Sequence, residues 1–217
     1  MKSILFDLDG TIIDPKIGIL KSIQYALEKL GAAVPGIEDL RWCIGPSLRV
    51  SFPKLLGIED KATIEEAVRL YRERFKPTGL YEYEPYPGAM DGLAALASEY
   101  RLFLATAKPQ VYAAEILRHM GAIDHFEKVY GDDMEGTFTD KGDLLAFILE
   151  EQGLAANSCV MIGDRHHDIQ AATRHGMPSV AVSYGYALDG EFDDHPPTAI
   201  SHGFHDLSDR IGEILAA

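Results

Sequence analysis

The stretch Ile4-Leu5-Phe6-Asp7-Leu8-Asp9-Gly10-Thr11 decides the fold. Its apolar run predicts a buried strand, and two carboxylates, Asp7 and Asp9, follow at the end of that strand. Gly10 permits a tight backbone path and Thr11 supplies a hydroxyl. An ordinary turn is the alternative, because Asp and Gly are common turn residues. The rest of the chain has to decide between a turn and a site.

Further apolar runs predict strands that alternate with helices. The expected strands are 102–105, 128–130, 159–162, 179–182 and 199–200. Helices are expected near 89–99, 109–120, 142–152, 169–175 and 207–215. Alternating helices and apolar strands indicate a parallel sheet covered on both faces. We therefore expect an α/β fold with a Rossmann-like parallel sheet core.

A helical segment interrupts this series after the first strand. Asp14 is expected to cap a helix whose first residue is Pro15, and apolar residues then recur at helical spacing. Between Pro15 and Phe75 no convincing strand is found. The expected domains are an α/β core of residues 1–14 and 84–217, and an inserted all-helical cap domain of residues 15–83.

Composition limits the class of protein. The chain has 217 residues, a formal net charge of -14 and 47% hydrophobic residues. The acidic balance argues against a binder of nucleic acid polymers, which normally shows a basic face. The chain begins directly with a strand and has no long apolar segment, so we expect no signal peptide, no membrane span and a cytoplasmic protein. Cys43 and Cys159 are expected to be reduced thiols.

Polar residues also follow the strand 102–105. Thr106 and Ala107 lie where this strand ends and a helix begins. Ligands of parallel sheets bind beyond the carboxyl ends of the strands, and N–H groups at a helix start favour phosphate. The alternative for Thr106 is simple capping of a turn.

The strand 159–162 leads into Gly163-Asp164-Arg165-His166-His167-Asp168. With Asp7 and Asp9, its two aspartates place four carboxyl groups at one end of the sheet. Such a cluster repels itself without a cation, and oxygen ligands suit Mg²⁺. The two histidines are expected to be solvated or to serve packing, in preference to a zinc site.

Lys141 opens the helix that follows Asp140. A cation at this end opposes the helix dipole, so a phosphate or a metal-bound carboxylate nearby would explain its place. An exposed lysine is the alternative.

Together these residues resemble the four motifs of the haloacid dehalogenase superfamily of phosphohydrolases. The motifs are 7–11, Thr106, Lys141 and Gly163-Asp164 with Asp168. Within the superfamily, the chain looks most like the phosphoglycolate phosphatase group. Three short stretches, 44–46, 86–88 and 161–165, resemble its nucleotidase-like branch.

The resemblance implies a role for each motif. Asp7 would be the nucleophile and Asp9 the general acid and base. Mg²⁺ would be bound by Asp7, the Asp9 carbonyl and Asp164, with Asp168 acting mainly through water. The expected substrate-binding residues are Gly10, Thr11, Thr106, Ala107 and Lys141 in the core, and Gly45 and Arg49 in the cap.

Two residues depart from the family pattern. Gly142 stands where many relatives have proline, and Ala107 replaces a frequent Asn or Ser. Neither change removes a catalytic side chain, although the first could loosen how Lys141 is held.

Several readings remain open from the sequence. A dehalogenase does not need Asp9, and a phosphonatase would be expected to lack it. A phosphomutase acting on a sugar phosphate would keep every motif, and a non-catalytic regulatory module could keep the fold. The substrate is expected to be a small phosphorylated metabolite, with phosphoglycolate, a nucleoside monophosphate and a sugar phosphate all compatible. A monomer and a homodimer are both compatible with the sequence.

Overall fold

A computed structural model describes the chain from residue 2 to residue 216. The chain divides into two compact units. The first consists of Met1–Asp14 with Pro85–Ala217, and the second of Pro15–Glu84. The chain therefore leaves the first unit once and returns to it once.

A six-stranded sheet forms the centre of the first unit, in the order β5-β4-β1-β6-β7-β8. Its strands are β1 (Ser3–Phe6), β4 (Arg101–Pro109), β5 (Lys128–Asp132), β6 (Cys159–Gly163), β7 (Ser179–Val182) and β8 (Ala199–Ser201). Neighbouring strands run parallel, and central Phe6 pairs with Leu104 on one side and Ile162 on the other. The expected α/β fold with a parallel sheet is confirmed.

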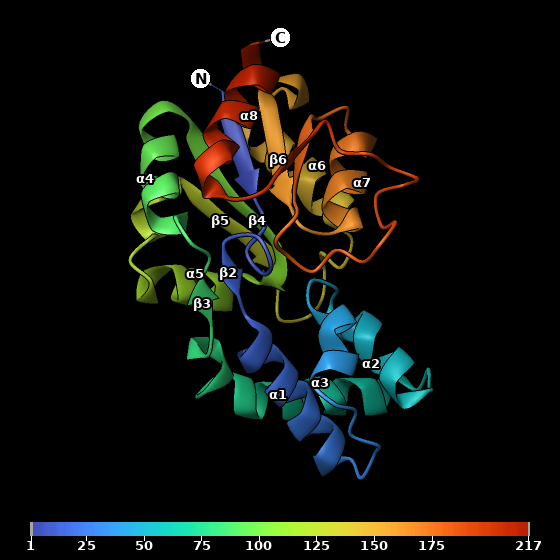
Figure 1. Ribbon diagram of the computed structural model, residues 1–217. Coiled ribbons are helices and arrows are strands. Elements are labelled where there is room, and N and C mark those ends of the chain that lie inside the picture. Colours follow the sequence, from blue (N-terminus) through green and yellow to red (C-terminus); the bar gives the residue numbers. More distant parts are fainter. Residues whose placement is uncertain (1, 217) are drawn as a thin grey trace. The chain divides into compact units, whose positions relative to one another are not determined.

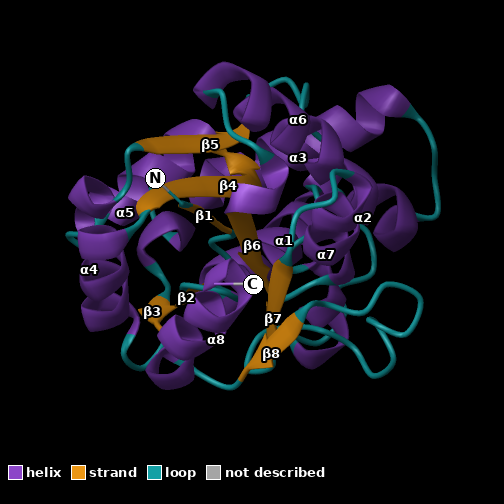
Figure 2. Cartoon of the chain, turned by 90° about the horizontal axis from the view of Figure 1, so that it is seen from above, coloured by secondary structure: helices purple, strands orange, loops and turns teal. Residues whose placement is uncertain are grey.

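Helices cover both faces of this sheet (Figures 1 and 2). They are α4 (Ala89–Glu99), α5 (Gln110–His119), α6 (Lys141–Gln152), α7 (His166–Arg174) and α8 (Phe204–Ala216), with two short 3-10 turns, η3 (Ile123–His125) and η4 (Ala156–Ser158). Helix α7 begins three residues earlier than expected. Its N-terminus has a capping arrangement in which the Asp168 carboxylate accepts a hydrogen bond from the Arg165 N–H.

Alternation along β1 divides the core between the two faces. Leu5 packs into a cluster with residues of α6 and α7, including Leu145 and Ala172. Phe6 points the other way, where its ring stacks on Phe204 of α8 with 6.5 Å between ring centroids. Successive strand residues face opposite sides, so a wholly apolar strand buries both of its faces. This central strand delivers the next residue, Asp7, to the edge of the sheet.

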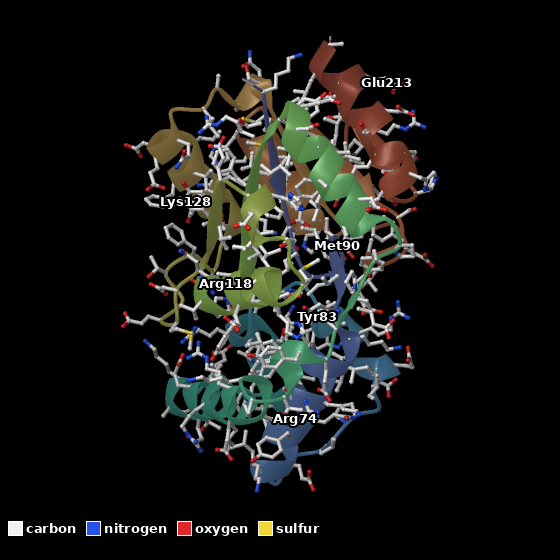
Figure 3. All side chains as sticks on the ribbon, turned by 90° about the vertical axis from the view of Figure 1, so that its left-hand side faces the viewer. Arg74, Tyr83, Met90, Arg118, Lys128 and Glu213 are labelled. Atoms are coloured by element: carbon white, nitrogen blue, oxygen red, sulfur yellow. The ribbon has the colours of Figure 1, made fainter. Side chains whose placement is uncertain are left out.

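The second unit is helical in all its longer elements. They are α1 (Lys16–Lys29), η1 (Glu38–Cys43), α2 (Leu48–Leu56), α3 (Lys61–Phe75) and η2 (Gly79–Tyr81). Its inner surface includes the buried stripe Leu20, Ile23 and Leu27 of α1. Arg74, labelled in Figure 3, pairs with Glu82 at 2.9 Å and holds the end of α3.

Two short strands were not expected. They are β2 (Ile13–Asp14) and β3 (Glu84–Pro85), which pair as a separate two-stranded sheet. The expectation that Asp14 caps α1 is wrong, because Pro15 occupies the cap position without a side-chain hydrogen bond. The Asp14 carboxylate instead accepts a hydrogen bond from the Tyr186 hydroxyl, far along the chain. In the described range, no helix combines the length and apolar character needed to cross a membrane.

Candidate active site

The loop after β1 holds Asp7 and Asp9 at the edge of the sheet. The Asp7 N–H donates to the Ile162 carbonyl at 2.9 Å, which continues the ladder with β6. Beyond Asp7 the chain turns back, because the Ile12 N–H donates to the Leu8 carbonyl at 2.9 Å. Both aspartates are buried, with 2% and 7% of their surfaces exposed. The motif is therefore a tight turn that directs two carboxylates inward.

Gly10 brings this turn against Asp164. Its φ angle is +83°, a region that favours glycine, and an added Cβ would lie 2.0 Å from Asp164 Oδ2. A side chain at position 10 would thus displace the carboxylate that follows β6. Gly10 serves the site by permitting this approach.

Asp164 is completely buried, and one of its oxygens has a partner. The Tyr186 N–H donates to Oδ2 at 2.8 Å, while Oδ1 has no hydrogen bond to the described residues. Burial, and then the negative charges of Asp168 and Asp7, raise the pKa of Asp164 well above its ordinary value. This carboxylate would be stabilised by a cation beside Oδ1.

Lys141 enters the site from the first turn of α6. Asp140 caps this helix by accepting a hydrogen bond from the Asp143 N–H at 3.0 Å. The Lys141 ammonium lies 3.0 Å from Asp7 Oδ1 and also contacts Asp168. Burial alone would lower the pKa of Lys141, but the charges of Asp168 and Asp7 outweigh it and raise the pKa. Lys141 is therefore a fixed positive charge beside Asp7.

Both oxygens of Asp168 are engaged by the protein. Oδ1 contacts the Lys141 ammonium, and Oδ2 accepts the Arg165 N–H at 3.1 Å. Gly163 allows this packing, because an added Cβ there would lie 2.3 Å from Asp168 Cγ. In this arrangement Asp168 supports Lys141 and the start of α7. Its expected part in metal binding stays a prediction.

Thr106 is buried at the point where β4 reaches the same edge. The strand continues to Pro109 instead of ending at residue 105, so the sequence placed its end too early. The Lys108 N–H donates to Thr106 Oγ1 at 3.2 Å, which leaves the threonine hydrogen available for donation. Ala107, next to it, is partly exposed.

Lys108 is a site residue that sequence reasoning missed. Its ammonium lies 2.8 Å from Asp9 Oδ2, and the two side chains are only 6% and 9% exposed. Burial raises the pKa of Asp9, and the nearby Lys108 charge opposes this rise without cancelling it. The signal in the sequence was a lysine two positions after Thr106.

His167 also comes closer to the site than expected. One of its ring nitrogens lies within 4.8 Å of carboxylate oxygens of Asp7 and Asp168. Its Nε2 atom is buried without a hydrogen bond to the described residues. Burial, and then the charge of Lys141, lower the pKa of His167 to about 3. The Lys141 ammonium already contacts both Asp7 and Asp168. We therefore do not assign a second cation site to His167 and these two aspartates.

Glu191 is a second residue near the site that sequence reasoning missed. Its carboxylate accepts hydrogen bonds from Arg165 Nε at 2.7 Å, the His166 N–H at 2.9 Å and the Leu188 N–H at 2.7 Å. These bonds hold the segment between Asp164 and Asp168. Glu191 therefore helps to hold Arg165 and the N-terminus of α7 in place.

The donor set fits a divalent metal ion. The carboxylates of Asp7, Asp9, Asp164 and Asp168 lie near one another, and the ammonium groups of Lys108 and Lys141 contact three of them, those of Asp9, Asp7 and Asp168. Four negative charges against two positive charges leave two negative charges if all are ionised. Buried Oδ1 atoms of Asp9 and Asp164 have no hydrogen bond among the described residues, and Asp7 Oδ1 has only the Lys141 contact. Hard oxygen donors of this kind suit Mg²⁺.

The remaining expected residues divide between the units. Thr11 is fully buried in the core unit, and its hydroxyl lacks a hydrogen bond to the described residues. Gly45 and Arg49 belong to the helical unit, where Arg49 Nε pairs with Glu65 at 2.6 Å. Their contact with a substrate stays a prediction.

Comparison with known families and proteins gives a consistent result. Residues 4–182 match the family described as haloacid dehalogenase-like hydrolase. A 5'-nucleotidase of Pseudomonas aeruginosa is 45% identical over 90% of this chain and 89% of its own length. The tyrosine-protein kinase PtkA of Mycobacterium tuberculosis is 34% identical over 96% of this chain and 72% of its own. A phosphoglycolate phosphatase of Escherichia coli O157:H7 is 30% identical over 98% and 93%.

Solved structures share the complete fold. A predicted phosphatase from Clostridium acetobutylicum superposes with a TM-score of 0.93 at 31% identity. The superposition covers 98% of each chain.

Proposed function

The chain belongs to the haloacid dehalogenase-like hydrolase family, and we propose that it is a Mg²⁺-dependent phosphatase that hydrolyses small phosphomonoesters. The observation that carries this proposal is the buried Asp7 carboxylate at the end of the central strand. It lies 3.0 Å from the Lys141 ammonium, in a cluster with Asp9 and Asp164. The nucleotidase and phosphoglycolate phosphatase relatives support phosphate esters as the substrates.

Asp7 acts as the nucleophile. One of its oxygens attacks phosphorus, the bond from phosphorus to the leaving oxygen breaks, and an aspartyl-phosphate forms. The Lys141 ammonium holds the carboxylate through its contacts with Asp7 and Asp168. A fixed side chain pointing at phosphorus lowers the cost of reaching the reactive geometry.

Asp9 carries the proton in both halves of the reaction. In its acid form it protonates the leaving oxygen, and as a carboxylate it then takes a proton from the attacking water. Burial raises the pKa of Asp9, which favours the protonated form at the start of the cycle. The water attacks phosphorus and releases Asp7 with inorganic phosphate.

The phosphoryl oxygens are bound by groups near the C-terminal end of β4 and at the N-terminal end of α6. Thr106 donates its hydroxyl hydrogen, Ala107 its backbone N–H and Lys141 its ammonium hydrogens. Donors fixed where negative charge develops stabilise the transition state, often as the largest contribution to catalysis. Gly10 and Thr11 complete the backbone around this position.

Asp7, the Asp9 carbonyl and Asp164 would hold Mg²⁺, with Asp168 acting through Lys141 and water. When bound, the ion neutralises the excess negative charge and polarises a phosphoryl oxygen. The helical unit acts as the cap that selects the leaving group, where Gly45 and Arg49 are the candidate contacts. We place the enzyme in the cytoplasm, as a monomer or homodimer.

The test is phosphate release from a panel of phosphomonoesters with and without Mg²⁺. The panel contains a nucleoside 5'-monophosphate, phosphoglycolate, a sugar phosphate and p-nitrophenyl phosphate. Release that requires Mg²⁺ and disappears with EDTA is expected. Isomerisation of a sugar phosphate without phosphate release would instead support a phosphomutase. Absence of turnover on the whole panel would support a non-catalytic module and contradict the proposal.

A further inference from the structure

Lys108 occupies a position next to the proton donor. Its ammonium lies 2.8 Å from Asp9 Oδ2. Both side chains of this ion pair are buried, with at most 9% of their surface exposed. Burying an ion pair costs desolvation free energy, so such a pair is weak evidence of a purely stabilising role. The roles assigned to Asp7, Asp9, Thr106 and Lys141 also make no use of this charge.

An irregularity in β4 sets the direction of this side chain. Thr106 pairs with Gly131 of β5, but the next pair joins Pro109 to Asp132. Gly131 and Asp132 are adjacent on β5, whereas their partners on β4 are separated by Ala107 and Lys108. These two residues therefore form a bulge on β4. Bulges of this kind often occur beside active sites, where they redirect a side chain.

The neighbouring strand is built to accept the bulge. A Cβ added at Gly131 would lie 2.4 Å from the Lys108 carbonyl oxygen and 2.8 Å from the Gln110 nitrogen. On the other side, the Lys108 N–H is tied to Thr106 Oγ1 at 3.2 Å. The backbone of Lys108 is thus fixed by contacts on both sides, which positions the ammonium beside Asp9.

We propose that Lys108 places a positive charge beside Asp9 that assists departure of the leaving group, and that it adapts the site to alkyl phosphomonoesters. This inference rests on the proposed role of Asp9. The leaving oxygen must come within hydrogen-bond reach of Asp9 to be protonated. Lys108 contacts the same Asp9 carboxylate, so its charge lies close to the leaving oxygen. Its positive charge stabilises the negative charge that grows on that oxygen as the bond to phosphorus breaks.

The chemistry explains the preference for alkyl esters. During the first step the Asp7–phosphorus bond forms, the bond to the leaving oxygen breaks and the Asp9 proton passes to that oxygen. Lys108 keeps its protons throughout and contributes charge. An alkoxide is a poor leaving group and needs this help, whereas a nitrophenolate carries its charge well without it.

The experiment compares leaving groups across matched variants. For wild type, Lys108→Met and Lys128→Met, kcat/KM is measured with p-nitrophenyl, phenyl and ethyl phosphate. Lys128, labelled in Figure 3, lies at the start of β5, is 42% exposed and pairs with Glu151, so its substitution is the matched loss of charge. We expect Lys108→Met to lose about 10²-fold on ethyl phosphate and much less on p-nitrophenyl phosphate. Lys128→Met should match wild type on all three.

A second variant tests the inference if Lys108→Met does not fold. Lys108→Gln also removes the charge, but its amide can still donate to Asp9, and it should show the same selective loss. Equal losses on all three esters in a folded variant would mean that Lys108 does not act at the leaving oxygen, and unchanged rates would remove it from the reaction. Either result overturns the inference while leaving the phosphatase proposal intact. No phosphate release by wild type from any ester would instead defeat the proposed function.

Discussion

The Lys141 ammonium lies 3.0 Å from Asp7 Oδ1, and both side chains are almost completely buried. The lysine comes from the first turn of α6 and the aspartate from the end of β1. Asp168 of α7 contacts the same ammonium. Three elements that are distant in sequence therefore meet at one charge.

Replacing that charge should affect both turnover and stability. Lys141→Met removes a phosphoryl-binding group, so kcat/KM should fall by at least about 10²-fold. It also leaves Asp7 and Asp168 without their buried cation, and breaking such a pair costs roughly 3–5 kcal/mol. Steady-state kinetics and urea unfolding measure the two effects, with Lys128→Met as control. A variant with normal kcat/KM would exclude Lys141 from the reaction.

Asp9→Asn should separate the two halves of the reaction. The amide cannot exchange a proton, so hydrolysis of the aspartyl-phosphate should become the slow step. With p-nitrophenyl phosphate, whose leaving group needs little protonation, rapid mixing should show a burst of about one nitrophenolate per enzyme followed by slow turnover. Steady turnover at the wild-type rate would contradict the acid and base role.

Gly10→Ala tests the close approach of the first loop to Asp164. The added Cβ would lie 2.0 Å from Asp164 Oδ2, so the carboxylate must move and kcat should fall about 10²-fold. Gly121→Ala is the matched control, because Gly121 has a similar φ of +77° and nothing within 4 Å of its added Cβ. It should lose only about 1–2 kcal/mol of stability from backbone strain. Equal activity of the two variants would show that the approach to Asp164 does not matter.

Glu191→Gln should change how stability depends on pH. Burial alone would raise the pKa of Glu191, but hydrogen bonds from Arg165, His166 and Leu188 lower it to about 2 from an ordinary 4.5. A lowered carboxyl pKa stabilises the fold above pH 4.5, and this stabilisation is lost as the pH falls from 4.5 towards 2. By the factor of about 1.4 kcal/mol per pKa unit, the contribution is on the order of 3 kcal/mol.

Urea unfolding between pH 7 and pH 3 measures this difference. Wild type should be more stable than Glu191→Gln at pH 7, and the gap should narrow on acidification. Glu127→Gln is the control, because its partner Arg101 forms an ion pair in which Glu127 is 46% exposed, and surface pairs contribute about 0–1 kcal/mol. A gap that stays constant with pH would show that the Glu191 charge is not the cause.

The parallel sheet could be predicted from the sequence because each central strand is an apolar run between polar turns. Lys141 begins a helix, and its place in the site was implied by the family resemblance. Asp7, Thr106 and Asp164 could be placed together because each follows an expected strand, and parallel strands end at one edge of the sheet. This reasoning needs only local pattern and topology. It is independent of the details of packing.

The missed features all depend on contacts between distant segments. Asp14 lies where a helix cap is expected, but its carboxylate accepts a hydrogen bond from the Tyr186 hydroxyl instead. Lys108 lies beyond the strand end that was expected at residue 105, because the bulge opposite Gly131 leaves no mark in the sequence of β4. Glu191 lies in a long loop without a motif, and only the folded chain brings it to Arg165. Local pattern cannot predict which side chain returns to a site from elsewhere.

The central claim is that Asp7 forms a covalent bond to phosphorus, and trapping that bond is the most direct measurement. Enzyme turning over p-nitrophenyl phosphate with Mg²⁺ is quenched in acid, reduced with borohydride and analysed by peptide mass spectrometry. An aspartyl-phosphate is reduced to homoserine, which we predict at position 7 in wild type and, in larger amount, in Asp9→Asn. Homoserine at another aspartate, or none while phosphate is being released, would contradict the account.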